Sequence, residues 1–247
     1  METTKILIKD YFSITLDKKY EYPLNFNFKC KINKKNKSNL SSNGIYFIIE
    51  RETNHIIYIG INLSTDPRKK NFVDNERINK HLQSFTMRGT KIGINNNKNK
   101  WFDKCDKINE ELFLLRDKIP NKDTGTTSDK NRLSYANLFW DKFKKNENFE
   151  SILNEHFYAY YFKIDYFDNL MIDFFSKNFN KKKSKELFRK EIVNFFEEPL
   201  SKEYKPYVYI VKKNKNYPFI GKWSSNIFRI DAVKKSISRL INNYKDD

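Results

Sequence analysis

The segment GIYFIIERETNHIIYIG, residues 44–60, constrains the fold more than any other part of this chain. Two runs rich in β-branched and aromatic residues, 44–49 and 56–60, flank a polar stretch from Glu50 to His55. Runs of this composition favour β-strands, and a short polar connection between them favours a turn. The segment therefore predicts a β-hairpin that carries one tyrosine in each strand.

The hairpin opens with the tripeptide GIY, whose glycine is Gly44, and closes with YIG, whose glycine is Gly60; eleven residues separate the two tyrosines. This pair of tripeptides resembles the signature of the GIY-YIG nuclease superfamily. The resemblance covers about residues 44–85 and 155–180. It implies an α/β (α+β) fold with a three-stranded antiparallel sheet flanked by helices. A core hairpin whose tyrosines only pack is the alternative interpretation.

The charge of the chain indicates a polyanionic partner. It has 48 Lys and Arg against 31 Asp and Glu, a formal net charge of +17. Such a field attracts nucleic acid or an anionic membrane surface, and we expect nucleic acid. Part of the lysine excess reflects Lys- and Asn-rich runs such as NKKNKSN, which are typical of an AT-rich genome.

We expect a cytoplasmic protein. No window approaches the roughly 18 continuous apolar residues of a membrane-spanning helix. Cys30 and Cys105 lie far apart in the sequence, and two such cysteines make neither a disulfide framework nor a metal cluster. This cysteine usage fits a reducing compartment.

The chain divides into three predicted parts. An N-terminal arm, 1–43, precedes a core, 44–180, that an insertion at about 86–150 interrupts, and a basic extension, 181–247, follows. The extension contains a second hairpin pattern at 207–221. A small catalytic core has little surface for reading bases, so we expect the additional segments to contribute to sequence recognition.

A helix is predicted after the hairpin, through Arg77 and onward to Phe85. Leu82 and Phe85 fall on one apolar face of this helix. Arg77 and His81, four residues apart, lie on an adjacent face and point in the same direction. The two polar side chains can therefore contact the same ligand.

The resemblance assigns roles to several of these residues. It implies that Tyr46 deprotonates or positions the attacking water and that Tyr58 lies beside it and contacts phosphate or water. It also implies an arginine that contacts the scissile phosphate. Arg77 is favoured because its pairing with His81 resembles restriction-type members. Arg68, eight residues after Gly60 in a basic run, is the alternative.

The metal ligand departs from the family pattern. The family uses a glutamate on the helix after the third strand, followed twelve residues later by an asparagine. The segment DNLMIDFFSKNFN resembles this region, with Asp168 in place of the glutamate and Asn180 as the asparagine. An aspartate binds Mg²⁺ through oxygen as a glutamate does. Glu191, on the apolar side of a later helix, is the alternative ligand, because an inward carboxylate needs a compensating partner.

The leading expectation is an endonuclease dependent on Mg²⁺ or Mn²⁺ that hydrolyses double-stranded DNA. Within the superfamily we expect a type II restriction enzyme that acts as a homodimer, with a cognate DNA methyltransferase encoded nearby. A homing or repair nuclease is an alternative within the class. A catalytically silent DNA-binding protein on the same fold is the alternative from another class, and Asp168 would then mark the loss of activity.

Overall fold

The predicted hairpin forms two of the four strands of the main sheet. In the computed structural model the described residues are 2–17, 27–32, 44–62, 81–82, 84–86, 132, 135–136, 138–143, 147–163, 197–209 and 220–222. Strands β4 (Gly44–Glu50) and β5 (Ile56–Asn62) pair antiparallel, which confirms the hairpin. In the turn between them Asn54 adopts the left-handed conformation, with φ 58°, which asparagine tolerates better than most residues.

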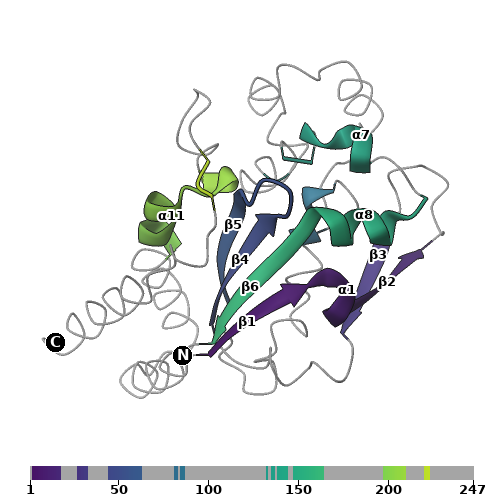
Figure 1. Ribbon diagram of the computed structural model, residues 1–247, viewed down its shortest axis with the longest axis horizontal. Helices are drawn as coiled ribbons and strands as arrows, with labels where there is room; N and C mark the ends of the chain where they lie inside the picture. Colours follow the sequence, from purple (N-terminus) through teal and green to yellow (C-terminus); the bar gives the residue numbers. More distant parts are fainter. Residues whose placement is uncertain are drawn as a thin grey trace, which may run out of the picture.

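The main sheet has four antiparallel strands in the order β1-β6-β4-β5 (Figure 1). Strand β6 (Phe157–Lys163) pairs with β4 on one side and with β1 (Glu2–Leu7) on the other. The mixed α/β class is confirmed, but the sheet has one strand more than expected. The additional strand is β1, which pairs with β6 from Tyr158 to Lys163, so that residues 2–7 belong to the sheet.

The aromatic-rich sequence of residues 151–164 predicts a strand, but that prediction is wrong for its first part: residues before β6 form a helix, α8 (Phe149–His156). Phe149, Leu153 and His156 are buried, and their spacing of four and three residues is that of one helix face. The aromatic run that follows favours the strand. The helical spacing of the apolar residues in 149–156 therefore determines the structure of this segment, although the aromatic residues that follow it favour a strand.

A second, two-stranded sheet follows β1. The single-turn helix α1 (Ile8–Tyr11) leads into β2 (Phe12–Asp17), which pairs antiparallel with β3 (Asn27–Ile32).

None of the helices that the structure describes is long and apolar enough to cross a membrane.

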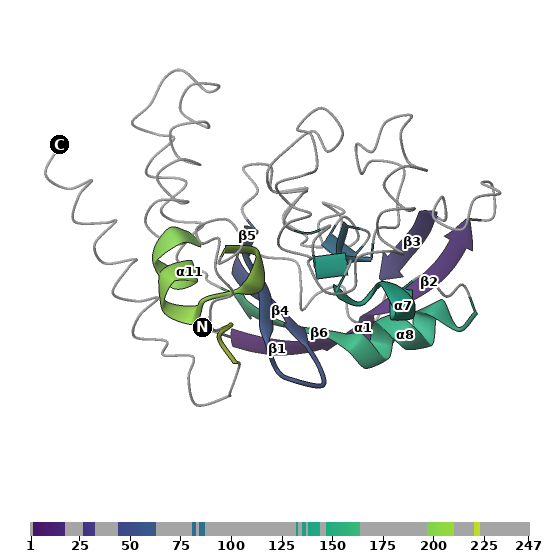
Figure 2. The same cartoon turned by 90° about the horizontal axis from the view of Figure 1, so that it is seen from above.

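The two faces of the main sheet are covered by different helices. Figure 2 shows α11 (Glu198–Tyr204) on one side of the hairpin and α7 (Trp140–Phe143) on the other. On the α11 side, the Tyr204 ring meets Phe47 edge to face at 5.6 Å. On the α7 side, the Phe143 ring stacks on Phe157 at 5.8 Å. Both faces of the sheet are therefore apolar core, and the face under α7 also carries the hairpin tyrosines.

The C-terminal region contacts the edge of the hairpin. Residues 207–209 are helical, so the strand predicted at the start of the second hairpin pattern is wrong there. Pro206 favours this turn, because its fixed φ suits the first position of a helix. Farther along, the Gly221 carbonyl accepts a hydrogen bond of 2.9 Å from the Ile56 amide of β5. The edge strand of the main sheet is thus partly covered by residues 220–222.

Candidate functional site

The register of the hairpin places both tyrosines on one face of the sheet. Tyr46 pairs with Gly60 and Ile48 pairs with Tyr58, so Tyr58 lies diagonally across from Tyr46 on the same face. Their ring centroids are 6.0 Å apart. The sequence prediction that the two tyrosines belong to one site is therefore consistent with their geometry.

Gly60 makes this arrangement possible. A Cβ atom at this position would overlap the ring and the hydroxyl of Tyr46, and it would lie 2.7 Å from Cε1 of Tyr58. These distances are too short for any side chain. The glycine therefore provides the space in which the two rings meet.

Gly44 has a packing role at the start of β4. A Cβ atom there would overlap the carbonyl oxygen of Phe162 in β6 and lie 3.0 Å from the ring of Tyr161. The side-chain amide of Asn62 donates a hydrogen bond of 3.4 Å to the Tyr161 hydroxyl at this same end of the sheet. Gly44 thus allows β4 and β6 to approach each other beneath Tyr161.

His81 joins the two tyrosines. Its Nε2 atom is hydrogen-bonded to the Tyr46 hydroxyl at 2.6 Å, and its ring centroid is 4.5 Å from that of Tyr58. Leu82 and Phe85, on the same helix, are fully buried as predicted. The structure therefore brings together Tyr46, Tyr58 and His81, three of the residues that the sequence singled out.

The Tyr46–His81 hydrogen bond provides a path for a proton. Tyr46 is 1% exposed and His81 is 5% exposed, so the bond is shielded from water. With Nε2 unprotonated, the imidazole accepts the hydroxyl proton, and the phenol oxygen keeps its lone pairs for another hydrogen. A proton taken up at the Tyr46 oxygen can therefore pass to His81 without entering solvent.

Arg132 adds a cation that the sequence did not predict. Its guanidinium lies 5.3 Å from the centroid of the Tyr58 ring, within the range of a cation–π interaction. Arg132 belongs to the stretch expected to be an insertion. The amphipathic pattern of residues 133–143 predicts a buried helix face, but it does not show which part of the sheet that face covers.

Five of the predicted site residues lie outside the described residues: Arg68, Arg77, Asp168, Asn180 and Glu191. Within the described part of the chain, no group of three or more His, Cys, Asp or Glu side chains could hold a metal ion. The residues placed around the two tyrosines therefore do not form a metal site by themselves.

A second tyrosine–histidine pair lies on the same face of the sheet. The Tyr135 hydroxyl is hydrogen-bonded to His156 Nε2 at 2.8 Å, and Lys142 Nζ donates to His156 Nδ1 at 3.4 Å. Burial, assisted by the charge of Lys142, lowers the pKa of His156 to about 3. The imidazole is therefore neutral, and because Nδ1 accepts from Lys142, Nε2 carries the hydrogen and donates it to Tyr135.

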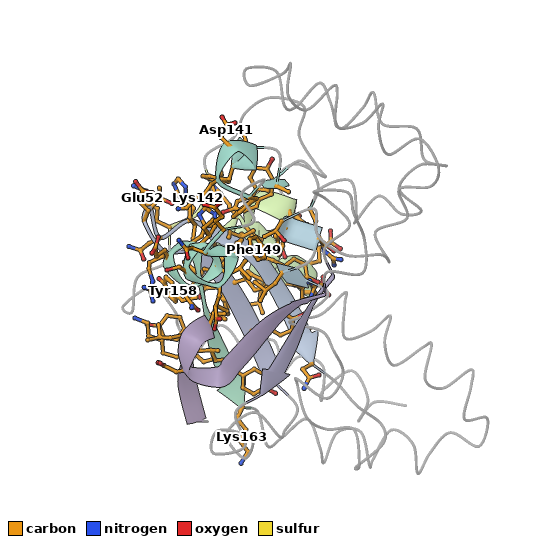
Figure 3. All side chains as sticks on the ribbon, turned by 90° about the vertical axis from the view of Figure 1, so that its right-hand side faces the viewer. Glu52, Asp141, Lys142, Phe149, Tyr158 and Lys163 are labelled. Carbon is orange, nitrogen blue, oxygen red and sulfur yellow. The ribbon has the colours of Figure 1, made fainter. Side chains whose placement is uncertain are left out.

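A buried carboxyl group completes this end of the hairpin. Glu50 is 4% exposed, and burial raises its pKa although the Thr53 hydroxyl donates a hydrogen bond of 2.9 Å to it. Burial also raises the pKa of Tyr135 well above its ordinary value, and the charge of Glu50 adds to this effect. Figure 3 shows Lys142 and Glu52 at this end of the sheet and Lys163 at the opposite end.

The candidate site thus draws on widely separated parts of the sequence. Tyr46 and Tyr58 come from the hairpin, His81 from the following helix and Arg132 from the stretch before α7. All of them lie on the face of the sheet opposite α11. No family model, curated protein or solved structure matches this chain.

Proposed function

We propose that this chain is a GIY-YIG endonuclease that hydrolyses phosphodiester bonds in double-stranded DNA. The observation that carries the proposal is the 2.6 Å hydrogen bond between the Tyr46 hydroxyl and His81 Nε2, formed beside Tyr58. The hairpin carries both signature tripeptides, and the histidine comes from the helix on which the resemblance expects it. The net charge of +17 favours a nucleic acid substrate.

Hydrolysis of a phosphodiester requires a group that takes a proton from the attacking water and cations around the phosphate. Tyr46 would accept the water proton as its own proton moves to His81. Tyr58 is partly exposed, whereas Tyr46 and His81 are buried, so Tyr58 is the member of this trio that a phosphate reaches first. Arg77, four residues before His81, is the proposed phosphate-contacting cation.

A divalent metal, Mg²⁺ or Mn²⁺, would stabilise the negative charge on the phosphate and the leaving oxygen. Asp168 with Asn180, or alternatively Glu191, would hold it. These residues lie outside the described part of the chain, and the side chains around Tyr46 offer no ligand set of their own. The proton path from water through Tyr46 to His81 uses only described residues.

Within the superfamily we propose a type II restriction enzyme that acts on a short site as a homodimer. The stretches outside the hairpin core are long, and they would supply the contacts to base edges that a small core lacks. A cognate DNA methyltransferase encoded nearby would distinguish this class from homing and repair nucleases.

A catalytically silent DNA-binding protein is the second candidate. The near-complete burial of Tyr46 and the aspartate at position 168 favour it. The two candidates can be distinguished by DNA cleavage but not by DNA binding, because both would bind DNA with a steep salt dependence.

Incubation of the purified protein with mixed plasmid DNA tests the proposal. Discrete fragments that appear with Mg²⁺ or Mn²⁺ and disappear with a chelator support a restriction enzyme. DNA binding without nicking under either metal would refute the nuclease and leave the silent binder.

The substitution Tyr46→Phe tests the proposed proton path. It removes the hydroxyl that contacts His81 and keeps the buried ring, so we expect cleavage to be lost and DNA binding to remain. Tyr160→Phe is the matched control, since Tyr160 lies on the opposite face of the sheet, next to Lys5. Asp168→Ala and Glu191→Ala, compared in parallel, identify the metal ligand as the one whose loss abolishes cleavage.

A further inference from the structure

We propose that Arg132 is a second phosphate-binding cation of this site, supplied by the stretch that the sequence marks as an insertion. The proposal rests on the premise of the proposed function that DNA binds at the face carrying Tyr46 and Tyr58. Its ligand is a phosphate group of the DNA backbone.

The position of Arg132 carries the proposal. Its guanidinium lies 5.3 Å from the centre of the Tyr58 ring, and both side chains are partly exposed. Tyr46 and His81, in contrast, are buried. Arg132 and Tyr58 therefore form the outer layer of the site, through which a DNA phosphate would approach the Tyr46 hydroxyl.

A buried anchor fixes this position. Tyr135 lies one helical turn after Arg132 and is hydrogen-bonded to His156 at 2.8 Å. Its ring also meets the ring of Phe85 edge to face at 5.6 Å. Because Phe85 follows His81 by one helical turn, the same contacts that bury Tyr135 tie the position of Arg132 to that of His81.

The chemistry of the guanidinium suits this role. Its planar fork binds two phosphate oxygens at once through N–H groups that lie in its plane, whereas the face of the plane interacts with an aromatic ring. One arginine can therefore contact Tyr58 and a phosphate at the same time. Arg132 would orient the phosphate above the two tyrosines, and its charge is already close to the position where negative charge develops.

The competing interpretation is that Arg132 only stabilises the fold through its contact with Tyr58. The two roles differ in one measurable quantity, the dependence of DNA binding on salt concentration. A lost phosphate contact makes the negative slope of log K against log salt less steep by about 0.9, because fewer counterions are released on binding. A lost structural contact leaves that slope unchanged.

Binding of the full-length chain to a short DNA duplex is measured at several salt concentrations in the presence of a chelator, so that no cleavage occurs. For Arg132→Ala we expect a slope smaller by about one and an affinity lower by about 10-fold, and for Arg132→Lys a slope close to that of the wild type. Arg132→Gln keeps most of the side-chain length and is measured in parallel, in case the alanine variant does not fold.

Arg51→Ala is the matched control, since Arg51 is an exposed arginine in the turn of the same hairpin. A wild-type slope in both Arg132→Ala and Arg132→Gln overturns the proposal. So does an equal decrease in Arg51→Ala, because the effect would then belong to the general positive charge. These outcomes are independent of cleavage: a wild-type protein that binds DNA without nicking it refutes the nuclease while the slopes still decide the role of Arg132.

Discussion

The substitution Gly60→Ala should destabilise the protein, although alanine is normally the better residue in a strand. An unhindered change of this kind would stabilise a strand by about 0.5–1 kcal/mol. Here the new methyl group would overlap the ring and hydroxyl of Tyr46 and lie 2.7 Å from Cε1 of Tyr58. The Tyr46 ring is 1% exposed and cannot turn outward, so either the strands separate or the ring moves away from His81.

The expected magnitude follows from two costs. Overpacking a buried position costs about 1–3 kcal/mol, and disruption of the buried Tyr46–His81 hydrogen bond costs about 1–3 kcal/mol more. After the gain in strand propensity is subtracted, we expect a net loss of roughly 1–5 kcal/mol. For a chain of this length that corresponds to a decrease in Tm of about 2–20 °C.

Thermal and urea unfolding of Gly60→Ala, Tyr46→Ala and the double variant provide the assay. Because the Tyr46 ring is the main obstacle, Gly60→Ala should lower the free energy of unfolding much less when residue 46 is already alanine. We expect an interaction energy between the two substitutions of at least about 1 kcal/mol. A Gly60→Ala variant that unfolds within about 1 °C of the wild type would refute this account of the glycine. Strict additivity in the double variant would show that the clash is not with Tyr46.

Three further predictions concern the second tyrosine–histidine pair and the buried carboxyl group of Glu50. The pKa of His156 is lowered to about 3 in the folded protein, so the stability that this histidine contributes is complete above the unfolded pKa of 6.5 and decreases as the pH falls. At pH 5 the free energy of unfolding should be lower by about 2 kcal/mol than at pH values above 6.5. Urea unfolding on both sides of this range should show the loss, and His156→Gln should abolish it. Tyr135→Phe leaves the buried N–H of His156 without its acceptor, so it should cost about 1–3 kcal/mol in the same assay. Burial raises the pKa of Glu50, so ionisation of this carboxyl group opposes folding at neutral pH. The substitution Glu50→Gln should therefore raise Tm at pH 7. This gain in Tm should disappear at a pH below the unfolded pKa of 4.5, where the carboxyl group is protonated in both states.

The parts of the fold that were predictable depend on local patterns. The hairpin follows from two β-rich runs around a polar turn, and the burial of Leu82 and Phe85 follows from helical spacing. The sequence also singled out His81, from its i, i+4 relation to Arg77, and His81 lies beside Tyr46 and Tyr58. The hairpin and the two buried apolar residues were predictable because the relevant residues are neighbours in the sequence.

The parts that were missed depend on contacts across long sequence separations. Strand β1 pairs with β6, more than 150 residues later. The cation–π contact joins Arg132 to Tyr58, and the Tyr135–His156 hydrogen bond joins the stretch expected to be an insertion to the residue before β6. Local sequence patterns do not identify these contacts, because the partner of each apolar face is a property of the whole fold.

The two tyrosine–histidine pairs have the same chemical groups and different capacities. In the Tyr135–His156 pair both imidazole nitrogens are engaged, and the ring centroids of Phe139, Phe143 and Phe157 lie within 4.6–4.9 Å of His156. With a pKa near 3, this histidine accepts no proton at neutral pH, so the pair is suited to hold the sheet and its covering helices together.

His81, in contrast, lies between two tyrosines, one of them partly exposed and next to a guanidinium. Tyr58 and Arg132 are partly exposed and can meet an anionic substrate, whereas His156 is enclosed by phenylalanine rings. A tyrosine–histidine hydrogen bond by itself therefore does not identify a catalytic centre. The proposed site differs from the second pair in two residues: Gly60, which allows Tyr58 to lie beside Tyr46, and Arg132, which brings positive charge to the partly exposed ring of Tyr58.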